Sequence, residues 1–205
     1  MPLRLLLVRH AQSEWNADGR WQGQADPPLS ELGQQQATAA SEHVGVFDAI
    51  VASPLERAAH TAAIFAEATG VGPVLLDDGL VERHAGEWQG LTRDEIKARY
   101  PGYLEEGRRP PGWEPDEVLF ERLEAVLDRI ASIFEGRGVD QGEVLVLTHG
   151  GVIYRLEDHL GVREGRIPNL GGRWIERRPE GGWKPGERVV LIEESEAHIT
   201  TPTQL

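Results

Sequence analysis

The stretch Leu5-Leu6-Leu7-Val8-Arg9-His10 decides the fold, because four consecutive apolar residues run directly into two basic ones. A short apolar run of this kind is typical of a strand that is buried on both faces of a parallel sheet. The stretch Val144-Leu145-Val146-Leu147-Thr148-His149 has the same form. Ligands of parallel α/β sheets bind beyond the carboxyl ends of the strands, so we expect both histidines at the same edge of the sheet.

The rest of the chain alternates short apolar runs with capped or amphipathic segments, which predicts an α/β fold around a largely parallel sheet. Further strands are expected at residues 49–52 and 74–76, and a late hairpin from the runs 173–177 and 188–192. Capping and periodicity signals predict helices from Ser30 to about His43, from the Ser53-Pro54 start to Gly70, from Thr92 to Pro101, along the apolar face 123–134 to Gly136, and from Gly150 onward.

The composition is that of a globular protein with an acidic surface. A length of 205 residues suits one domain, and we expect residues 1–205 to form it. The 34 acidic and 21 basic side chains give a net charge of −13, which argues against a nucleic-acid partner and weakly against an anionic membrane. The absence of cysteine excludes disulfides, thiolate metal sites and cysteine nucleophiles. The early apolar stretch is too short to cross a membrane and its flanks are unlike a secretory signal, so a cytoplasmic location is expected.

Three further charged residues should reach the same sheet edge as the two histidines. Arg9 adjoins His10, Arg57 lies one turn into the helix after the 49–52 strand, and Glu82 follows the 74–76 strand by a short loop. Arginine side chains are suited to phosphate because the planar guanidinium donates to two oxygens at once. Charge elsewhere on the surface is largely screened beyond about 8 Å, so a local arginine cluster can still bind a phosphorylated small molecule.

Several blocks of the chain resemble the motifs of the histidine phosphatase superfamily, also called the phosphoglycerate mutase-like family. The blocks follow the family's order along most of the chain and comprise residues 7–16, 22–23, 29–33, 53–58, 80–82 with 86–91, and 148–151. The resemblance implies a three-layer sandwich in which helices flank a largely parallel central sheet. It departs from the family at Ala11, where glycine is usual, and in the block Trp113-Glu114-Pro115, where only Glu114 fits.

The resemblance also implies catalytic roles. His10 would attack phosphorus to give a covalent phosphohistidine, which water then hydrolyses. The side chains expected to hold the phosphoryl oxygens are Arg9, Arg57 and His149. Glu82 would protonate the leaving oxygen and then deprotonate the attacking water, with Glu87 as its competitor for this role.

The expected substrate contacts are Asn16, Gln22, Gly23, Arg83 and Gly150. No cofactor and no metal are implied, since the chain lacks HExxH, Walker-type and GxGxxG patterns and the arginines argue against a cation. The partner is expected to be a small phosphorylated metabolite, and a homodimer is left open. The remaining histidines, such as His43, His60 and His159, are interpreted as surface or helix-end residues.

A phosphatase acting on small phosphomonoesters is the function we predict from the sequence. A cofactor-dependent phosphoglycerate mutase is the alternative, because Glu82-Arg83-His84 resembles that group, although Ala85 stands where tyrosine is usual. We interpret Arg108-Arg109-Pro110-Pro111 as a short proline loop and not as the longer segment of the mutases. A site open to water favours hydrolysis of the phosphohistidine. A non-catalytic protein that binds phosphorylated ligands is the third and most distant possibility.

Overall fold

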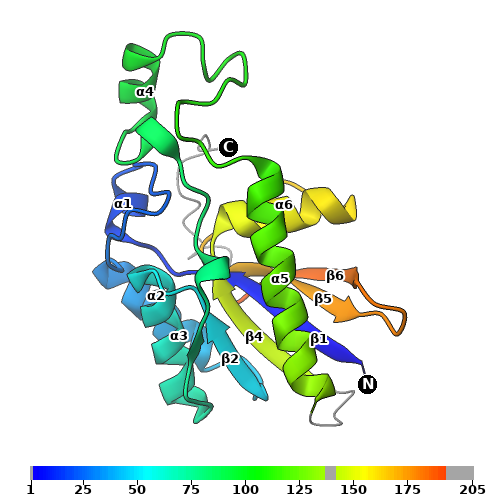
Figure 1. Cartoon of the computed structure of the whole chain (residues 1–205). Helices are drawn as coiled ribbons and strands as arrows, with labels where there is room; N and C mark the ends of the chain where they lie inside the picture. The colour runs from blue at the N-terminus through cyan, green and yellow to red at the C-terminus, as the bar shows by residue number, and fades with distance from the viewer. Residues whose placement is uncertain (1, 137–141, 193–205) are drawn as a thin grey trace.

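A computed structural model of the chain describes residues 2–136 and 142–192 and contains one six-stranded sheet at its centre (Figure 1). The strand order is β3-β2-β4-β1-β5-β6. The strands are β1 (Leu3–Arg9), β2 (Ala49–Ala52), β3 (Leu75–Leu76), β4 (Gly142–Thr148), β5 (Gly171–Arg177) and β6 (Trp183–Val190). The first four pair in parallel, whereas β5 runs antiparallel to β1 and β6 runs antiparallel to β5. The prediction of a largely parallel sheet is therefore confirmed.

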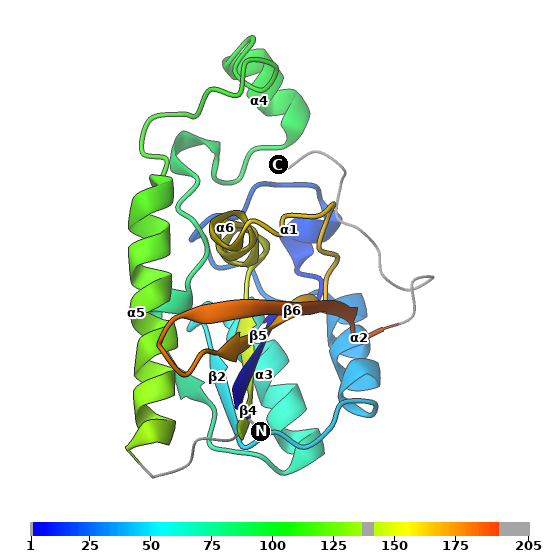
Figure 2. The same ribbon diagram turned by 90° about the vertical axis from the view of Figure 1, so that its right-hand side faces the viewer.

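Helices cover both faces of this sheet (Figures 1 and 2). Successive residues of a strand point to opposite faces, and here Leu5 and Leu7 pack in the cluster formed with α5 (Asp116–Glu135) and α6 (Gly150–Leu160). Leu6 and Val8 pack instead in the cluster formed with α2 (Glu31–Ser41) and α3 (Glu56–Thr69). The uninterrupted apolar run of β1 is thus explained by burial on both sides, and the three-layer arrangement is confirmed.

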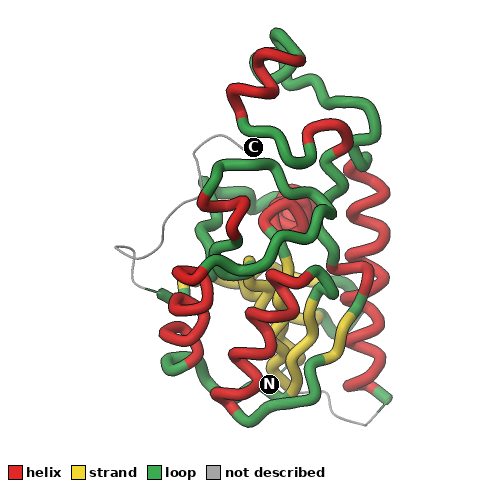
Figure 3. Tube along the Cα trace, turned by 90° about the vertical axis from the view of Figure 1, so that its left-hand side faces the viewer, coloured by secondary structure: helices red, strands yellow, loops and turns green. Residues whose placement is uncertain are grey.

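Residues 84–113 form a lobe beyond the carboxyl ends of the strands, which we call the aromatic lobe (Figure 3). The lobe contains η2 (Gly86–Trp88) and α4 (Arg93–Arg99), and it packs on Trp21, which follows the four-residue helix α1 (Glu14–Ala17). The ring centroids of Trp21 and Trp88 lie 5.2 Å apart and those of Trp88 and Trp113 lie 5.8 Å apart, both edge to face. Aromatic packing, and not a sheet, therefore holds this part of the molecule together.

Two of the element boundaries that differ from those predicted have a clear structural cause. The helix after β2 begins at Glu56 with Leu55 as its N-cap, because the Ser53 hydroxyl is engaged with His149 and is not used as a helix cap. The second hairpin strand occupies Trp183–Val190 and not 188–192. Gly181 and Gly182 adopt positive φ angles and turn the chain, so that Trp183 already pairs with Arg177 of β5.

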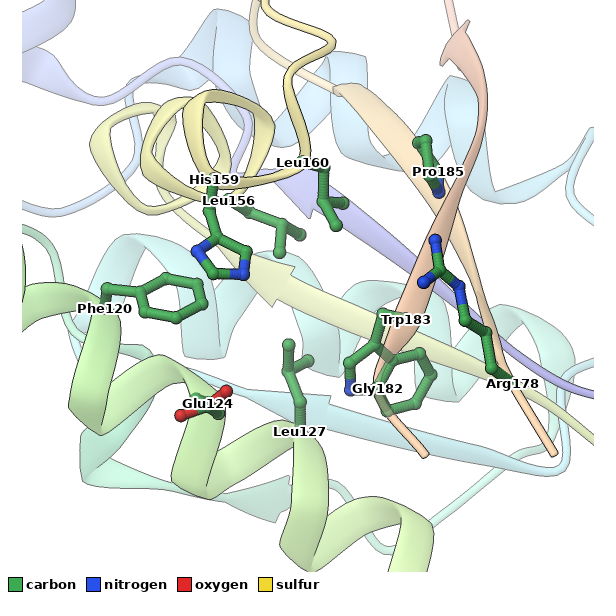
Figure 4. Close-up of a pocket in the computed structure, with 10 residues that line it drawn as sticks. All are labelled: Phe120, Glu124, Leu127, Leu156, His159, Leu160, Arg178, Gly182, Trp183 and Pro185. Carbon is green, nitrogen blue, oxygen red and sulfur yellow. The ribbon is translucent and has the colours of Figure 1, made fainter. Parts of the chain in front are cut away.

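A hollow of about 310 Å³ lies between α5, α6 and β6, away from the strand ends (Figure 4). His159 lines it and stacks on Phe120, with ring centroids 3.9 Å apart, and none of the predicted site residues lines it. His159 is exposed and lies one residue before the end of α6, which confirms the interpretation of it as a surface or helix-end residue. Within residues 2–136 and 142–192, no helix combines the length and apolar character needed to cross a bilayer.

Candidate active site

The ends of β1 and β4 bring His10 and His149 together. Arg9 pairs with Thr148 in the parallel register, and the His10 N–H donates to the Thr148 carbonyl at 2.9 Å. The two imidazole centroids are 5.2 Å apart, and both side chains are buried. Adjacent parallel strands thus place two histidines side by side although 138 residues separate them in the sequence.

The His10 ring keeps its Nε2 atom unprotonated. Its Nδ1 lies 2.6 Å from the Ala11 carbonyl, an acceptor, so Nδ1 carries the ring proton. Nε2 faces the Arg57 Nε–H group, which donates to it at 3.3 Å. Burial, followed by the positive charges of Arg57 and Arg9, holds the pKa of His10 well below its ordinary value. The imidazole is therefore neutral at neutral pH, as a nucleophile must be.

Arg57 is the second residue of α3 and is fully buried. Its Nη1–H and Nη2–H groups donate to the carbonyls of Ala25 at 2.8 Å and Gly23 at 2.9 Å, while the Asp26 carboxylate lies 4.0 Å away. Burial lowers the pKa of Arg57 to about 10, which leaves it charged at neutral pH. Gly23 has a positive φ, and a Cβ there would meet Gln89 at 2.4 Å, so glycine is required for this carbonyl to reach Arg57.

His149 precedes α6 and is held by Ser53. Its Nε2 lies 2.8 Å from the Ser53 Oγ, which accepts from the Leu55 N–H at 3.3 Å. A Ser53 hydroxyl that donates to Nε2 leaves the ring proton on Nδ1, an atom that is buried and has no partner among the described residues. Burial, then the charges of Arg57 and His10, holds the pKa of His149 well below its ordinary value, so the ring is a neutral donor at neutral pH.

The first loop supplies further donors near His10. The Asn16 Nδ2 group is buried without a partner among the described residues, because the Asn16 Oδ1 takes the Ser13 N–H at 3.2 Å. The Gln22 Oε1 accepts from the Ser13 hydroxyl at 2.7 Å. Arg9 donates to the Ile167 carbonyl at 2.9 Å, and its burial lowers its pKa while Tyr154 and Glu82 raise it. A buried donor without an acceptor costs about 1–3 kcal/mol, which a phosphate oxygen at this position would offset.

Glu82 lies beside these arginines and is positioned by backbone groups. Its Oε1 accepts from the Arg83 N–H at 2.7 Å and its Oε2 accepts from the Gly151 N–H at 3.0 Å. A Cβ on Gly151 would come within 2.4 Å of the Glu82 Oε1, so the carboxylate can approach only a glycine. Burial lowers the pKa of Arg9 and of Arg57, and the negative charge of Glu82 partly offsets this lowering, which places a carboxylate within electrostatic reach of the cationic groups.

Arg83 lies on the side of the site that faces the aromatic lobe, whereas Gly150 lies against Arg9. The Arg83 Nη1 group contacts the Glu114 carbonyl and the Asp116 carboxylate, both at 2.7 Å. Arg83 also lines a hollow of about 630 Å³ together with Arg109, Trp113 and Gly151. Gly150 opens α6, where a Cβ would lie 3.7 Å from the Arg9 Cδ.

Glu87, the competitor for the acid role, lies elsewhere. It is exposed on the aromatic lobe and accepts from the Tyr100 hydroxyl at 2.6 Å.

The two positions at which the sequence departs from the family have structural contacts. The Glu114 carboxylate accepts from the His84 N–H and pairs with Arg122. Ala11 is buried, and its N–H donates to Thr61 Oγ1. Its φ is negative, so the backbone at this position does not require glycine.

Sequence reasoning missed three residues that organise the site. Ser53 orients His149, and Arg122 donates to the carbonyls of Gly79, Val81 and Glu82, which fixes the loop that carries the carboxylate. Asn169 bonds to the His10 carbonyl and to Asn16. The Ser53-Pro54 motif carried a signal, although it also fits a helix cap.

Comparison with known proteins gives a consistent result. A model of the histidine phosphatase superfamily (branch 1) matches residues 5–171. A glucosyl-3-phosphoglycerate phosphatase of Mycobacterium tuberculosis is 37% identical over 198 residues, covering 89% of this chain and 87% of the relative. Phosphoserine phosphatase 1 of Hydrogenobacter thermophilus is 39% identical over 140 residues, covering 65% of this chain and 63% of the relative. Phosphoglycerate mutase-like protein 4 of Arabidopsis thaliana is 35% identical over 74% of this chain and 68% of the relative.

Solved structures agree with the sequence relatives. The mycobacterial glucosyl-3-phosphoglycerate phosphatase in complex with inorganic phosphate superposes with a TM-score of 0.79 at 30% identity, covering 93% of this chain and 99% of that one. A phosphoglycerate mutase of Bacillus anthracis superposes with a TM-score of 0.77 at 23% identity, over 90% and 92% of the two chains, which supports the fold alone.

Proposed function

Because the chain belongs to branch 1 of the histidine phosphatase superfamily, we propose that it hydrolyses small phosphomonoesters through a covalent phosphohistidine on His10. The observation that carries this proposal is the state of the His10 ring. Its proton is committed to the Ala11 carbonyl on Nδ1, while Nε2 keeps a lone pair directed toward Arg57. A buried neutral imidazole beside a fixed cation is arranged to attack an electrophile that brings negative charge with it.

The first step forms the bond between His10 Nε2 and phosphorus and breaks the bond between phosphorus and the leaving oxygen. Arg9, Arg57, the His149 Nδ1–H and the Asn16 Nδ2–H hold the phosphoryl oxygens, on which transition-state charge accumulates. A cation about 4 Å from such a charge contributes up to about 4 kcal/mol at an effective dielectric constant near 20, before desolvation. Glu82, in its protonated form, gives its proton to the leaving oxygen.

The second step returns the enzyme to its starting state. The Glu82 carboxylate takes a proton from a water molecule as the water oxygen attacks phosphorus. The nitrogen–phosphorus bond breaks, inorganic phosphate is released, and His10 regains its neutral form. Since the arginines supply the positive charge at phosphorus, we expect activity to persist in EDTA; loss in EDTA with rescue by a divalent ion would contradict metal independence.

The leaving group of the substrate is expected to lie toward Arg83 and the 630 Å³ hollow. Relatives at 37% and 39% identity are named for glucosyl-3-phosphoglycerate and phosphoserine, which are both phosphorylated carboxylates. Four arginines and three carboxylates line this hollow, and Arg83 is paired with Asp116, so we expect Arg109 to be the guanidinium that meets a carboxylate on the leaving group. We therefore expect phosphorylated small carboxylates among the substrates.

A phosphoglycerate mutase is the second candidate, favoured by Arg83 and Arg109 at the leaving-group side and by the mutase-like relative. Both reactions share the attack by His10, and they differ in whether water or a second substrate oxygen takes the phosphoryl group. The decisive assay supplies 3-phosphoglycerate with catalytic 2,3-bisphosphoglycerate and follows 2-phosphoglycerate and free phosphate together. We expect phosphate release to dominate, whereas isomerisation much faster than release would assign the chain to the mutases.

A further inference from the structure

Asn169 lies beneath the active site, in the segment between α6 and β5, and is fully buried. Its Nδ2 group donates to the carbonyl of His10 at 2.9 Å and to the Oδ1 of Asn16 at 3.2 Å. It therefore touches the backbone of the expected nucleophile and the side chain of an expected phosphate donor. We propose that Asn169 is a positioning residue that fixes the amide of Asn16 so that its Nδ2–H group faces the phosphoryl oxygens.

The polarity of these hydrogen bonds determines how both amides are turned. The His10 carbonyl can only accept, so the NH₂ end of Asn169 must face it. That NH₂ end and the Ser13 N–H can only donate, so both require the oxygen end of Asn16. The NH₂ end of Asn16 is consequently left over, buried and without a partner among the described residues. The His10 carbonyl, acting through Asn169, and the Ser13 N–H thus together set the orientation of a phosphate donor.

The backbone next to Asn169 is held in an unfavourable conformation. Leu170 has a φ of 57°, and it is the only non-glycine residue with a positive φ among the described residues. Its N–H donates to the Arg9 carbonyl and its carbonyl accepts from the Leu191 N–H, both at 3.0 Å. Such strain is retained where the surrounding structure dictates a specific placement, and here it brings the Asn169 side chain beneath the end of β1.

Residues 16 and 169 are the only asparagines in the chain, which permits a direct test of this proposal. Protein labelled with ¹⁵N-asparagine gives two side-chain NH₂ signals, and an Asn16→Ala variant leaves only that of Asn169. Titration with inorganic phosphate is expected to shift the Asn16 signal strongly, whereas the Asn169 protons exchange slowly and respond little. A strong phosphate response from Asn169 without one from Asn16 would overturn the assignment, and this result needs no Asn169 variant to fold.

A double-mutant cycle separates positioning from general structural support. We expect Asn169→Ala to raise the dissociation constant of inorganic phosphate by about 10-fold or more, but by less than about 3-fold in the Asn16→Ala background, since its effect runs through Asn16. Asn169→Ser, whose hydroxyl can still donate one hydrogen bond, should recover part of the affinity. Equal effects of Asn169→Ala in both backgrounds would overturn the proposal.

The inference rests on the proposed function only in requiring that phosphate binds beside His10. A wild-type protein whose Asn16 signal ignores phosphate would contradict the phosphate site itself and, with it, the role given to Asn169. A normal response of Asn16 combined with additive variants contradicts the role of Asn169 alone and leaves the phosphatase proposal standing.

Discussion

The strand ends and the aromatic lobe contribute to the site in different ways. At the strand ends, His10, Arg57 and His149 are nearly or fully buried, and each is fixed by a hydrogen bond to the backbone or to Ser53. On the lobe side, Arg109 is exposed and lies over the Trp113 ring at 4.8 Å, in a region held by aromatic packing. The difference suggests a division of labour: the sheet holds the phosphoryl group rigidly, and the lobe meets the variable leaving group.

The largest effect should come from removing the nucleophile at the strand ends. His10→Ala is expected to abolish turnover and the trapping of phosphate on the protein, because no other group can form the phosphoenzyme. His43→Ala is the matched control, since His43 is exposed beyond α2. Each protein is incubated with radioactive substrate and the reaction is quenched with alkali. The measurement is the acid-labile, alkali-stable label that remains on the protein. Wild-type labelling of the His10→Ala variant would place the nucleophile elsewhere.

How far the sequence predicts the molecule also differs between these two regions. Strand ends can be predicted from the sequence, because an apolar run followed by Arg9-His10 or Thr148-His149 indicates both the strand and the position of its last residue. The sheet order then brings the two histidines together without further information. Contacts between loops cannot be predicted in this way. Their groups bond to carbonyls or side chains that are distant in sequence, as for Arg122, Ser53 and Asn169, and no local pattern indicates that pairing.

The next largest effect should follow loss of a phosphoryl donor. Arg57→Ala and His149→Ala are each expected to lower kcat/KM by at least about 100-fold, as when a donor to transition-state charge is lost. Ser53→Ala should give a smaller fall in the same direction, because it leaves His149 in place but frees its ring tautomer. Steady-state kinetics on one phosphomonoester tests all three variants. A near-normal rate for Arg57→Ala or His149→Ala would exclude that side chain from holding the phosphoryl group.

Gly151 joins the two regions, because its N–H holds Glu82 while Gly151 also lines the hollow on the lobe side. Gly151→Ala should push the Glu82 carboxylate aside and lower kcat by about 10-fold or more for alkyl phosphates, which require protonation of the leaving oxygen. The loss should be smaller for p-nitrophenyl phosphate, whose leaving group needs little protonation. Equal losses on both substrates would separate Gly151 from proton transfer. Gly165→Ala is the control, because a Cβ there meets open space.

The strand-end region should also make stability depend on pH. The folded-state pKa values of His10 and His149 lie well below the ordinary value of 6.5. Above that pH both side chains are neutral in the folded and in the unfolded chain, so they do not make the free energy of unfolding depend on pH. As the pH falls below 6.5, the unfolded chain binds protons that the folded protein does not, and stability is lost until the folded values are reached. Each histidine contributes up to about 1.4 kcal/mol per pH unit in that window. Urea unfolding at several pH values should show a shallower dependence for His10→Ala than for wild type; parallel curves would contradict a depressed pKa.

The smallest effect is expected on the lobe, and it tests the division of labour most directly. Arg109 lines the hollow beside Arg83, and partial desolvation of its guanidinium there, together with the charge of Arg83, lowers its pKa. Arg108, its neighbour, points elsewhere: its guanidinium lies over the Tyr103 ring at 4.2 Å and pairs with Glu106 at 2.8 Å.

An exposed charge contact contributes about 0.2–1 kcal/mol, so Arg109→Ala should raise KM for phosphorylated carboxylates about 2- to 5-fold. Its effect on uncharged leaving groups should be smaller, and Arg108→Ala should discriminate between the two substrate classes as wild type does. The measurement is the ratio of kcat/KM for a carboxylated and an uncharged phosphomonoester in all three proteins. A fall in kcat for Arg109→Ala as large as that for Arg57→Ala would mean that the lobe takes part in holding the phosphoryl group, and the two regions could no longer be distinguished by function.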